Sequence, residues 1–258
     1  MDIKEILLDY YNDRKSLEDV TQSLSLFSIE YVDNNIAQLD VNRDLRKSVP
    51  EVVLAVNKKS VEIISISNKI LEKKGYVIIS KIKSTMLRKL ILYFKKKGLF
   101  VEEGYKSTSI LVYDKLESLP SNKGGKIGII CGGTSDIGIA EEVRLASISM
   151  GCSTLLGYDV GIAGIQRLLL SLKEMISNKV DVLVVVAGME GALSSVVTSL
   201  VNVPVIGIPA SVGYGYGSNG IASLSSMLQT CVFGLAVVNI DNGIGGGIYA
   251  GLIANKGK

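Results

Sequence analysis

Short runs of apolar residues recur along the second half of the chain, separated by longer stretches with apolar positions at helical spacing. Residues 182–186, Val-Leu-Val-Val-Val, show no polar alternation, which is typical of a strand buried on both faces of a parallel sheet. The pattern predicts strands at 126–131, 153–158, 181–187, 204–208 and 234–239, with helices at 136–150, 162–177, 191–201, 218–230 and 243–255. Because right-handed crossovers place such helices on both faces of the sheet, we predict a doubly wound α/β domain.

The first half of the chain shows a shorter version of the same alternation. Residues 1–48 are polar and helical in pattern, and strands are predicted at 52–56, 76–82 and 109–113, with helices at 60–74 and 84–97. Each of these helices is followed by a glycine, Gly75 or Gly98, which suits a left-handed position after a helix. The strand–helix–strand order implies a largely parallel sheet. Since 119–125 is the best linker by its turn residues, we predict a smaller N-terminal α/β domain over 1–120, with a helical lead-in, and a larger domain over 121–258.

Composition limits the class of protein further. The 258 residues are 47% hydrophobic and include 27 glycines, mostly in the second half, and the net charge is only +3. This balance is typical of an α/β enzyme and gives no strong field for nucleic acid. The first five residues are too charged for a signal peptide, and the apolar runs are too short to cross a membrane. We therefore expect a soluble, cytoplasmic protein without a nucleic-acid or membrane partner.

Histidine is absent from the sequence. This removes the usual proton shuttle near neutral pH, the commonest metal ligand, and every nucleophile pair that depends on histidine. The three cysteines lack CxxC spacing, which argues against a disulfide framework and a structural zinc site. Cys131 and Cys152 are predicted to be core residues. Cys231 lies at a loop junction, and the residues alone leave it open as core or reactive thiol.

Glycine and polar residues follow each predicted strand of the second half, at the edge where α/β sheets bind ligands. The loop after the first strand suits a phosphate, because it opens a helix N-terminus. It also resembles a dehydrogenase loop, with Asp159 at the end of the next strand. However, Asp136 occupies the position of that loop's middle glycine, and the Tyr-x-x-x-Lys pair of Tyr93 and Lys97 lies upstream of the loop. We therefore disfavour the dehydrogenase interpretation and keep an ordinary capped turn as its simpler alternative.

The other strand ends carry further candidate groups. Glu190 stands between glycines after the third strand, where desolvation on one side is expected to raise its carboxyl pKa toward a catalytic value; an exposed loop acid is the alternative. The remaining candidates follow the fourth and fifth strands, in 209–218 and 239–247. A plain flexible loop explains 209–218 nearly as well as a segment that wraps a ligand.

Taken together, several segments resemble the carboxylase superfamily of purine synthesis that acts on aminoimidazole ribonucleotide. Within it they are most similar to the LarB-type pyridinium-3,5-biscarboxylic acid mononucleotide synthases. The segments are Gly133-Thr134-Ser135-Asp136, Asp159-Val160-Gly161-Ile162-Ala163-Gly164, Gly188-Met189-Glu190-Gly191-Ala192, Ser211-Val212-Gly213-Tyr214-Gly215, and Cys231 with Asn239-Ile240-Asp241-Asn242-Gly243. The resemblance covers 126–254 nearly continuously. Upstream, 39–46 and Pro50-Glu51 also fit the N-terminal part of that family. The implied fold is a PurE-like, flavodoxin-like three-layer αβα sheet.

The resemblance implies a carboxylase and hydrolase that acts on nicotinic acid adenine dinucleotide. Cys231 aligns with a nucleophilic cysteine, and Glu190 is the candidate for moving the ring proton. The candidate substrate-binding residues are Gly133, Thr134, Ser135, Asp136, Asp159, Arg167, Gly188, Met189, Ser211, Gly213, Asn239, Asp241 and Asn242. CO2 or bicarbonate is the co-substrate, no cofactor is tightly bound, no metal ligands are expected, and Mg²⁺ is left open as an assisting ion. A homo-oligomer is implied, an octamer among the forms it allows.

Some residues depart from the family pattern. Ser194, Ala210 and Ser48 replace the usual proline, threonine and glycine, and Asn42 and Gln166 stand where histidine is frequent. None of them is Cys231 or Glu190. Two alternatives stay open: an enzyme of the same fold that acts on aminoimidazole ribonucleotide, and a nucleotide-binding module without catalysis.

Overall fold

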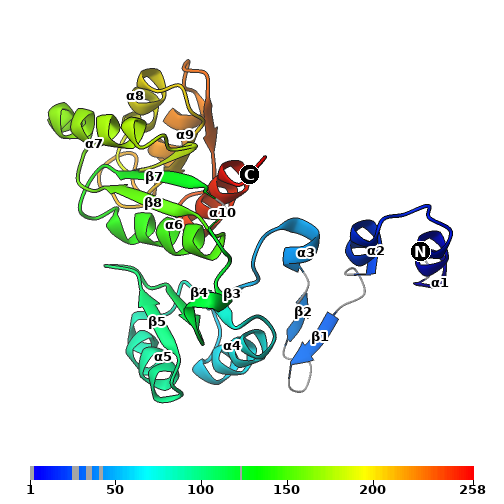
Figure 1. Ribbon diagram of the computed structural model, residues 1–258. Helices are drawn as coiled ribbons and strands as arrows, with labels where there is room; N and C mark the ends of the chain where they lie inside the picture. The colour runs from blue at the N-terminus through cyan, green and yellow to red at the C-terminus, as the bar shows by residue number, and fades with distance from the viewer. Residues whose placement is uncertain (1–2, 25–28, 33–36, 41–42, 123) are drawn as a thin grey trace.

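The computed structural model of the protein describes residues 3–24, 29–32, 37–40, 43–122 and 124–258. The described chain forms a two-stranded hairpin, a four-stranded sheet and a five-stranded sheet (Figure 1). The two larger sheets belong to the first and second halves of the chain, respectively. Asn42, one of the departures from the family pattern, lies outside the described residues.

The five-stranded sheet confirms the predicted doubly wound architecture. Its strands are β7 (Lys126–Cys131), β8 (Ser153–Gly157), β9 (Val182–Ala187), β10 (Val205–Pro209) and β11 (Leu235–Val237). Neighbours are parallel, in the order β8-β7-β9-β10-β11. Counted along the chain this is 2-1-3-4-5, the order of flavodoxin-like folds. All six residues of β9 are buried, as its unbroken apolar sequence predicts.

Helices cover both faces of this sheet (Figure 1). One face packs against α6 (Ile137–Ser149) and α10 (Gly243–Ala254). The other packs against α7 (Ile165–Ser177), which follows the short 3-10 turn η4 (Ile162–Gly164), and against α8 (Ala192–Leu200) and α9 (Ile221–Leu228). Glycine lets α10 approach α6 closely, because a Cβ on Gly247 would lie 2.7 Å from the Val143 carbonyl oxygen.

The four-stranded sheet is mixed, so the expectation of a largely parallel sheet is wrong. Its order is β3 (Val52–Leu54), β4 (Tyr76–Ser80), β6 (Ile110–Tyr113) and β5 (Phe100–Glu103), with α4 (Ser60–Lys74) and α5 (Ser84–Lys96) on one face. Only β3 and β4 are parallel. The unpredicted strand β5 turns back directly into β6, and a short connection of this kind joins antiparallel strands. Gly75 and Gly98 have φ of 74° and 77°, which confirms their left-handed role.

The lead-in is only partly helical. It contains α1 (Ile3–Tyr11), α2 (Leu17–Leu24) and α3 (Arg43–Lys47), but also the antiparallel pair β1 (Ile29–Val32) and β2 (Ala37–Asp40). The prediction of helix over 1–48 is therefore wrong for the hairpin. Two four-residue segments here pair with each other instead of continuing a helix, because packing context decides the structure of such short segments more than their own pattern does.

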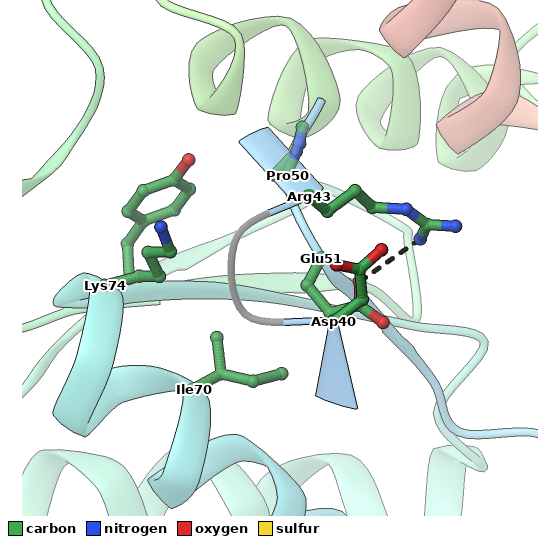
Figure 2. Close-up of a pocket in the computed structure, with 7 residues that line it drawn as sticks. Asp40, Arg43, Pro50, Glu51, Ile70 and Lys74 are labelled. Atoms are coloured by element: carbon green, nitrogen blue, oxygen red, sulfur yellow. Dashed lines mark hydrogen bonds and ion pairs between the residues drawn. The ribbon is translucent and has the colours of Figure 1, made fainter. Parts of the chain in front are cut away.

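An ion pair between Arg43 and Glu51 joins the lead-in to the start of the four-stranded sheet (Figure 2). Arg43 Nη1 lies 3.2 Å from Glu51 Oε2, and the Arg46 guanidinium pairs with Asp40. Burial raises the pKa of Glu51, an effect partly opposed by the charge of Arg43. The cavity beside these groups measures about 10 Å³, enough for roughly one water molecule. Its size makes the cluster a structural support rather than a ligand site.

The two larger sheets share one helical layer. Ile78 and Leu111 of the four-stranded sheet pack against Leu145 and Ala146 of α6, and α6 and α10 lie between the two sheets (Figure 1). The helix α6 is therefore covered on opposite sides. This position accounts for its buried carboxylates, which come from the adjacent residues Glu141 and Glu142.

Candidate active site

A cavity of about 530 Å³ opens at the carboxyl ends of the five-stranded sheet. It is walled by the loops after β7, β8, β9 and β10. The strand order reverses between β7 and β9, and ligands of open α/β sheets bind at such a switch point. Seven of the predicted site residues line it, namely Gly133, Ser135, Asp136, Gly188, Met189, Glu190 and Gly213.

The loop after β7 is closed on itself by Asp136. The carboxylate accepts a hydrogen bond from the Gly133 N–H at 2.8 Å, and the side chain is almost fully buried just before α6. Burial raises the pKa of Asp136, the Gly133 N–H opposes this shift, and the charge of Asp241 adds to it. This hydrogen bond fixes the Asp136 carboxylate against the backbone of its own loop.

The loop after β9 makes a tight turn against the loop after β10. Met189 has φ of 51° and Gly191 has φ of 67°, and the Gly191 N–H donates to the Gly188 carbonyl at 2.9 Å. A Cβ on Gly188 would lie 2.3 Å from the Val212 carbonyl oxygen, so glycine is required for this close approach. Glu190 is exposed on the cavity wall. The sequence led us to expect that Glu190 is shielded from solvent on one side, and within a single chain it is not.

Several predicted residues lie beside the cavity and make structural contacts. Arg167 Nη1 donates to Asp159 Oδ2 at 2.6 Å, in a half-exposed ion pair. Asn242 caps α10 by accepting from the Gly245 N–H at 2.9 Å. Thr134 and Asn239 are exposed. None of these five, nor Ser211 or Asp241, is among the described residues that line the 530 Å³ cavity.

Ser211 and Asp241 instead belong to an adjoining polar cleft. The Ser211 N–H donates to Asp241 Oδ1 at 2.8 Å, which joins the loops after β10 and β11. Asp241 has φ of 56°, as Asp159 has φ of 55° after β8. Left-handed non-glycine residues are uncommon and cluster at functional sites. Asp159, Met189 and Asp241 thus adopt this conformation after three strands of the sheet.

The three cysteines have different surroundings. Cys131 and Cys152 are buried in the core, as predicted, and burial raises the pKa of the Cys131 thiol to about 11. Cys231 is exposed and is not among the described residues that line the cavity. Helix α9 starts at the ligand edge, where a Cβ on Gly220 would lie 3.1 Å from the Ala210 carbonyl oxygen.

From that edge the chain runs away from the cavity. After α9 it passes Cys231 and enters β11, whose first residue, Leu235, pairs with Val205 at the start of β10. Cys231 thus precedes the amino ends of the strands, whereas the cavity lies at their carboxyl ends. The thiol and the cavity of one chain are separated by the length of α9.

Some residues that line the cavity and the adjoining cleft were not among those predicted from the sequence. Ile162, Leu193 and Tyr214 add apolar surface to the cavity, and Lys81 and Lys106 of the N-terminal domain line the adjoining cleft. Tyr214 and Ile162 lie inside the motifs described above, so their positions after predicted strands could have identified them. No local signal connects the two lysines to this sheet.

Two features are absent from the residues that the structure describes. Among them, no group of three or more acids or cysteines is arranged to hold a metal ion. Within the same residues, no helix has both the length and the apolar character that crossing a bilayer requires.

A small-molecule cavity at the switch point of a 2-1-3-4-5 parallel sheet defines an α/β protein of the flavodoxin-like class. The sequence profile of AIR carboxylase matches residues 126–257, and that of the LarB/PurE-like N-terminal domain matches residues 31–102. The chain belongs to the AIR carboxylase superfamily, as a LarB-type member. Membership indicates an enzyme of the carboxylase or mutase type.

A relative is similar to this protein across nearly the whole chain. An uncharacterized protein of Methanocaldococcus jannaschii is 41% identical over 253 residues, covering 98% of this chain and 96% of its own length. The similarity includes both halves of the molecule, so the N-terminal domain and the carboxylase-type domain occur together in that protein as well.

Proposed function

We propose that the protein carboxylates the pyridinium ring of nicotinic acid adenine dinucleotide and hydrolyses its phosphoanhydride. The products are pyridinium-3,5-biscarboxylic acid mononucleotide and AMP, the first step toward a nickel-pincer nucleotide cofactor. The observation that carries this proposal is the joint presence of a LarB-type N-terminal domain and an AIR carboxylase domain with a cavity at its switch point.

The chemistry follows from the electron-poor ring. A Cys231 thiolate adds to a ring carbon of the pyridinium cation, which gives a neutral enamine. The adjacent enamine carbon attacks CO2, supplied directly or from bicarbonate, and forms the new C–C bond. Glu190 accepts the proton from that carbon, and the released electron pair expels the thiolate and restores the aromatic ring. Water then cleaves the phosphoanhydride. This sequence needs no histidine, in agreement with a chain that has none.

The location of Cys231 requires a second copy of the chain. Its thiol is exposed and lies away from the cavity of its own chain, so the proposal brings it to the cavity of a neighbouring copy in a homo-oligomer. Phe233, two residues from Cys231, is almost fully exposed, and so is Tyr216, two residues from the cavity-lining Tyr214. A contact between two copies would bury both aromatic side chains, and aromatic residues are enriched at protein interfaces. The same contact would cover Glu190 and supply the desolvation that its own chain lacks.

The test is an assay with the purified protein, bicarbonate and nicotinic acid adenine dinucleotide. Mass spectrometry should detect AMP and the dicarboxylated pyridinium mononucleotide in equal amounts. Cys231→Ser should abolish both products, whereas Cys152→Ser, a change at a buried thiol of the core, should retain them. Parallel reactions with and without a chelator decide whether Mg²⁺ assists the hydrolysis. If the wild-type protein forms neither product, the proposal is wrong.

A second candidate is favoured by the AIR carboxylase match over residues 126–257. An enzyme that acts on aminoimidazole ribonucleotide would interconvert the carboxylated imidazole nucleotides, and mass spectrometry can follow this reaction as well. A catalytically inert module would bind the dinucleotide with and without Cys231 and turn over nothing. Carboxylation of the dinucleotide, interconversion of imidazole nucleotides, and binding without turnover are therefore distinguished by these assays.

A further inference from the structure

A second cavity of about 220 Å³ adjoins the first at the boundary between the two domains. Loop 104–109 of the N-terminal domain forms one wall, and the start of α6 with the loops after β10 and β11 forms the other. Ser135 and Val212 line both cavities. A ligand that fills the first cavity can therefore extend past Ser135 into the second, which we name the polar cleft.

The two cavities differ in chemistry. The first is lined mostly by glycine, alanine and aliphatic side chains, whereas the polar cleft is lined by lysines, hydroxyls and carboxylates. The nicotinate ring and its own ribose fit the first cavity, where Glu190 lies on the wall, and the second phosphorylated sugar of a dinucleotide suits the polar cleft. The arrangement fits a dinucleotide with the two halves in different cavities, whereas a mononucleotide would be held mainly by the first.

The charged groups of the cleft are not equivalent. Lys81 lies 3.2 Å from Glu142 Oε2, so these two charges offset each other. Asp241 is engaged by the Ser211 N–H. In the part of the chain that the structure describes, Lys106 is paired with no carboxylate, and its ammonium lies 5.7 Å from the centroid of the Tyr105 ring. Lys106 is therefore the cation of this cleft that is available to an anion.

The backbone holds Lys106 in place against α6. Lys106 has φ of 56°, and a Cβ on Gly138 would lie 2.5 Å from its carbonyl oxygen. The neighbouring Tyr105 N–H donates to Glu141 Oε2 at 3.0 Å. The loop thus abuts the first turn of α6, where free N–H groups and the helix dipole add to the attraction for phosphate.

We propose that the polar cleft binds the adenylate half of the dinucleotide and that Lys106 is the ligand of its phosphate. Ser107 and Thr108, on the same loop, offer hydroxyls to the phosphate or ribose. The N-terminal domain would then make the site specific for a dinucleotide over a mononucleotide. The inference rests on the proposed function for the identity of the ligand.

Binding calorimetry in CO2-free buffer tests this inference without carboxylation of the ligand. The ligands are nicotinic acid adenine dinucleotide, nicotinic acid mononucleotide and AMP, each titrated into the wild type, Lys106→Ala and Lys179→Ala. Lys179 is an exposed lysine with φ of 55° outside both cavities, so its variant matches the charge and backbone change. Loss of one charge-assisted phosphate contact should weaken the dinucleotide and AMP about tenfold in Lys106→Ala. The mononucleotide should change less than about twofold, and Lys179→Ala should bind all three ligands as the wild type does.

The outcomes separate this inference from the proposed function. Equal weakening of the dinucleotide and mononucleotide by Lys106→Ala, or no weakening at all, overturns the cleft assignment even in an active enzyme. AMP binding that depends on Lys106 supports the cleft even if the wild type carboxylates nothing, in which case only the proposed function fails. A wild-type protein that binds neither dinucleotide nor AMP overturns both.

Discussion

Lys81 of the N-terminal domain donates a hydrogen bond to the main-chain carbonyl of Asp241, with 2.8 Å between nitrogen and oxygen. The same ammonium pairs with the buried Glu142, whose other oxygen accepts from Ser109 Oγ at 2.9 Å. Asp241 in turn accepts from the Ser211 N–H. The N-terminal domain thus holds the two loops that border the polar cleft, which gives this domain a direct part in the geometry of the site.

The first prediction concerns Lys81→Met. The substitution keeps the aliphatic stem but leaves the Glu142 carboxylate buried without a cation, and it frees the Asp241 carbonyl. Removing one partner of a buried polar contact costs roughly 1–3 kcal/mol of folding free energy. Urea denaturation should show this loss, whereas Lys83→Met, two residues along on an exposed side chain, should change stability by less than about 0.5 kcal/mol. Equal midpoints for the two variants would refute the role of Lys81.

The adjacent carboxylates of α6 are predicted to respond to pH in opposite directions. Burial alone would raise the pKa of Glu141, but hydrogen bonds from Arg144, Tyr158 and the Tyr105 N–H bring it below the ordinary 4.5. Burial raises the pKa of Glu142 above the same value, although Lys81 and Ser109 oppose this. The stabilising effect of ionised Glu141 is therefore present above pH 4.5 and is lost as pH falls through its lower folded pKa.

For Glu142 the sign is reversed. The folded state binds its proton more tightly than the unfolded state does, so its contribution is most favourable below pH 4.5 and is lost as pH rises through the higher folded pKa. Unfolding free energies measured from pH 7 down to pH 3 test both. The advantage of wild type over Glu141→Gln should shrink on acidification, and that over Glu142→Gln should grow. Parallel curves for the two variants would contradict the assignment.

The sequence predicts the C-terminal domain well because most of its strands are local runs of apolar residues, as in β9, and turns rich in glycine and polar residues separate these strands from the helices. It predicts less of the N-terminal domain. The strand β5, Phe100–Glu103, is a four-residue edge strand with two exposed ends, and its pairing with β6 rather than its own pattern defines it. The first cavity could also be predicted from local sequence, because glycine-rich loops directly follow the strands that border it.

The rest of the site depends on contacts that no local pattern contains. Lys81 and Asp241 are 160 residues apart, and they meet only because α6 packs between the two sheets. For Cys231, by contrast, the sequence did contain the relevant signal. The residue lies before a predicted strand and not after one, which predicts a position at the edge of the sheet opposite the cavity.

Gly188→Ala is predicted to destabilise the protein. Its Cβ would lie 2.3 Å from the Val212 carbonyl oxygen, so the loops after β9 and β10 would have to separate, at a cost of roughly 1–3 kcal/mol. At Gly213 the nearest atoms to a Cβ are 3.7 Å away, so Gly213→Ala should leave the unfolding free energy within about 0.5 kcal/mol of wild type. Thermal unfolding of the pair checks the prediction. Similar midpoints would show that the loops adapt without cost.

The last prediction decides whether Cys231 serves its own cavity or that of another copy. Asp136→Ala removes the acid that closes the loop beside the cavity, and Cys231→Ala removes the thiol, so each variant alone should be inactive. If the thiol of one copy enters the cavity of another, mixed oligomers contain some sites with both groups intact. Random mixing in equal amounts should then restore about one quarter of wild-type activity, because each site draws its cavity and its thiol from different copies.

The mixture is prepared by unfolding and refolding the two variants together, and AMP release measures the recovered activity. Cys231→Ala mixed with the double variant Asp136→Ala/Cys231→Ala is the control, and it should stay inactive because it contains no thiol at position 231. If the thiol acts within its own chain, no subunit of the test mixture has both groups, and activity stays absent. That outcome would require α9 to rearrange so that Cys231 reaches the carboxyl ends of the strands, against the β10–β11 pairing that places the residue before Leu235.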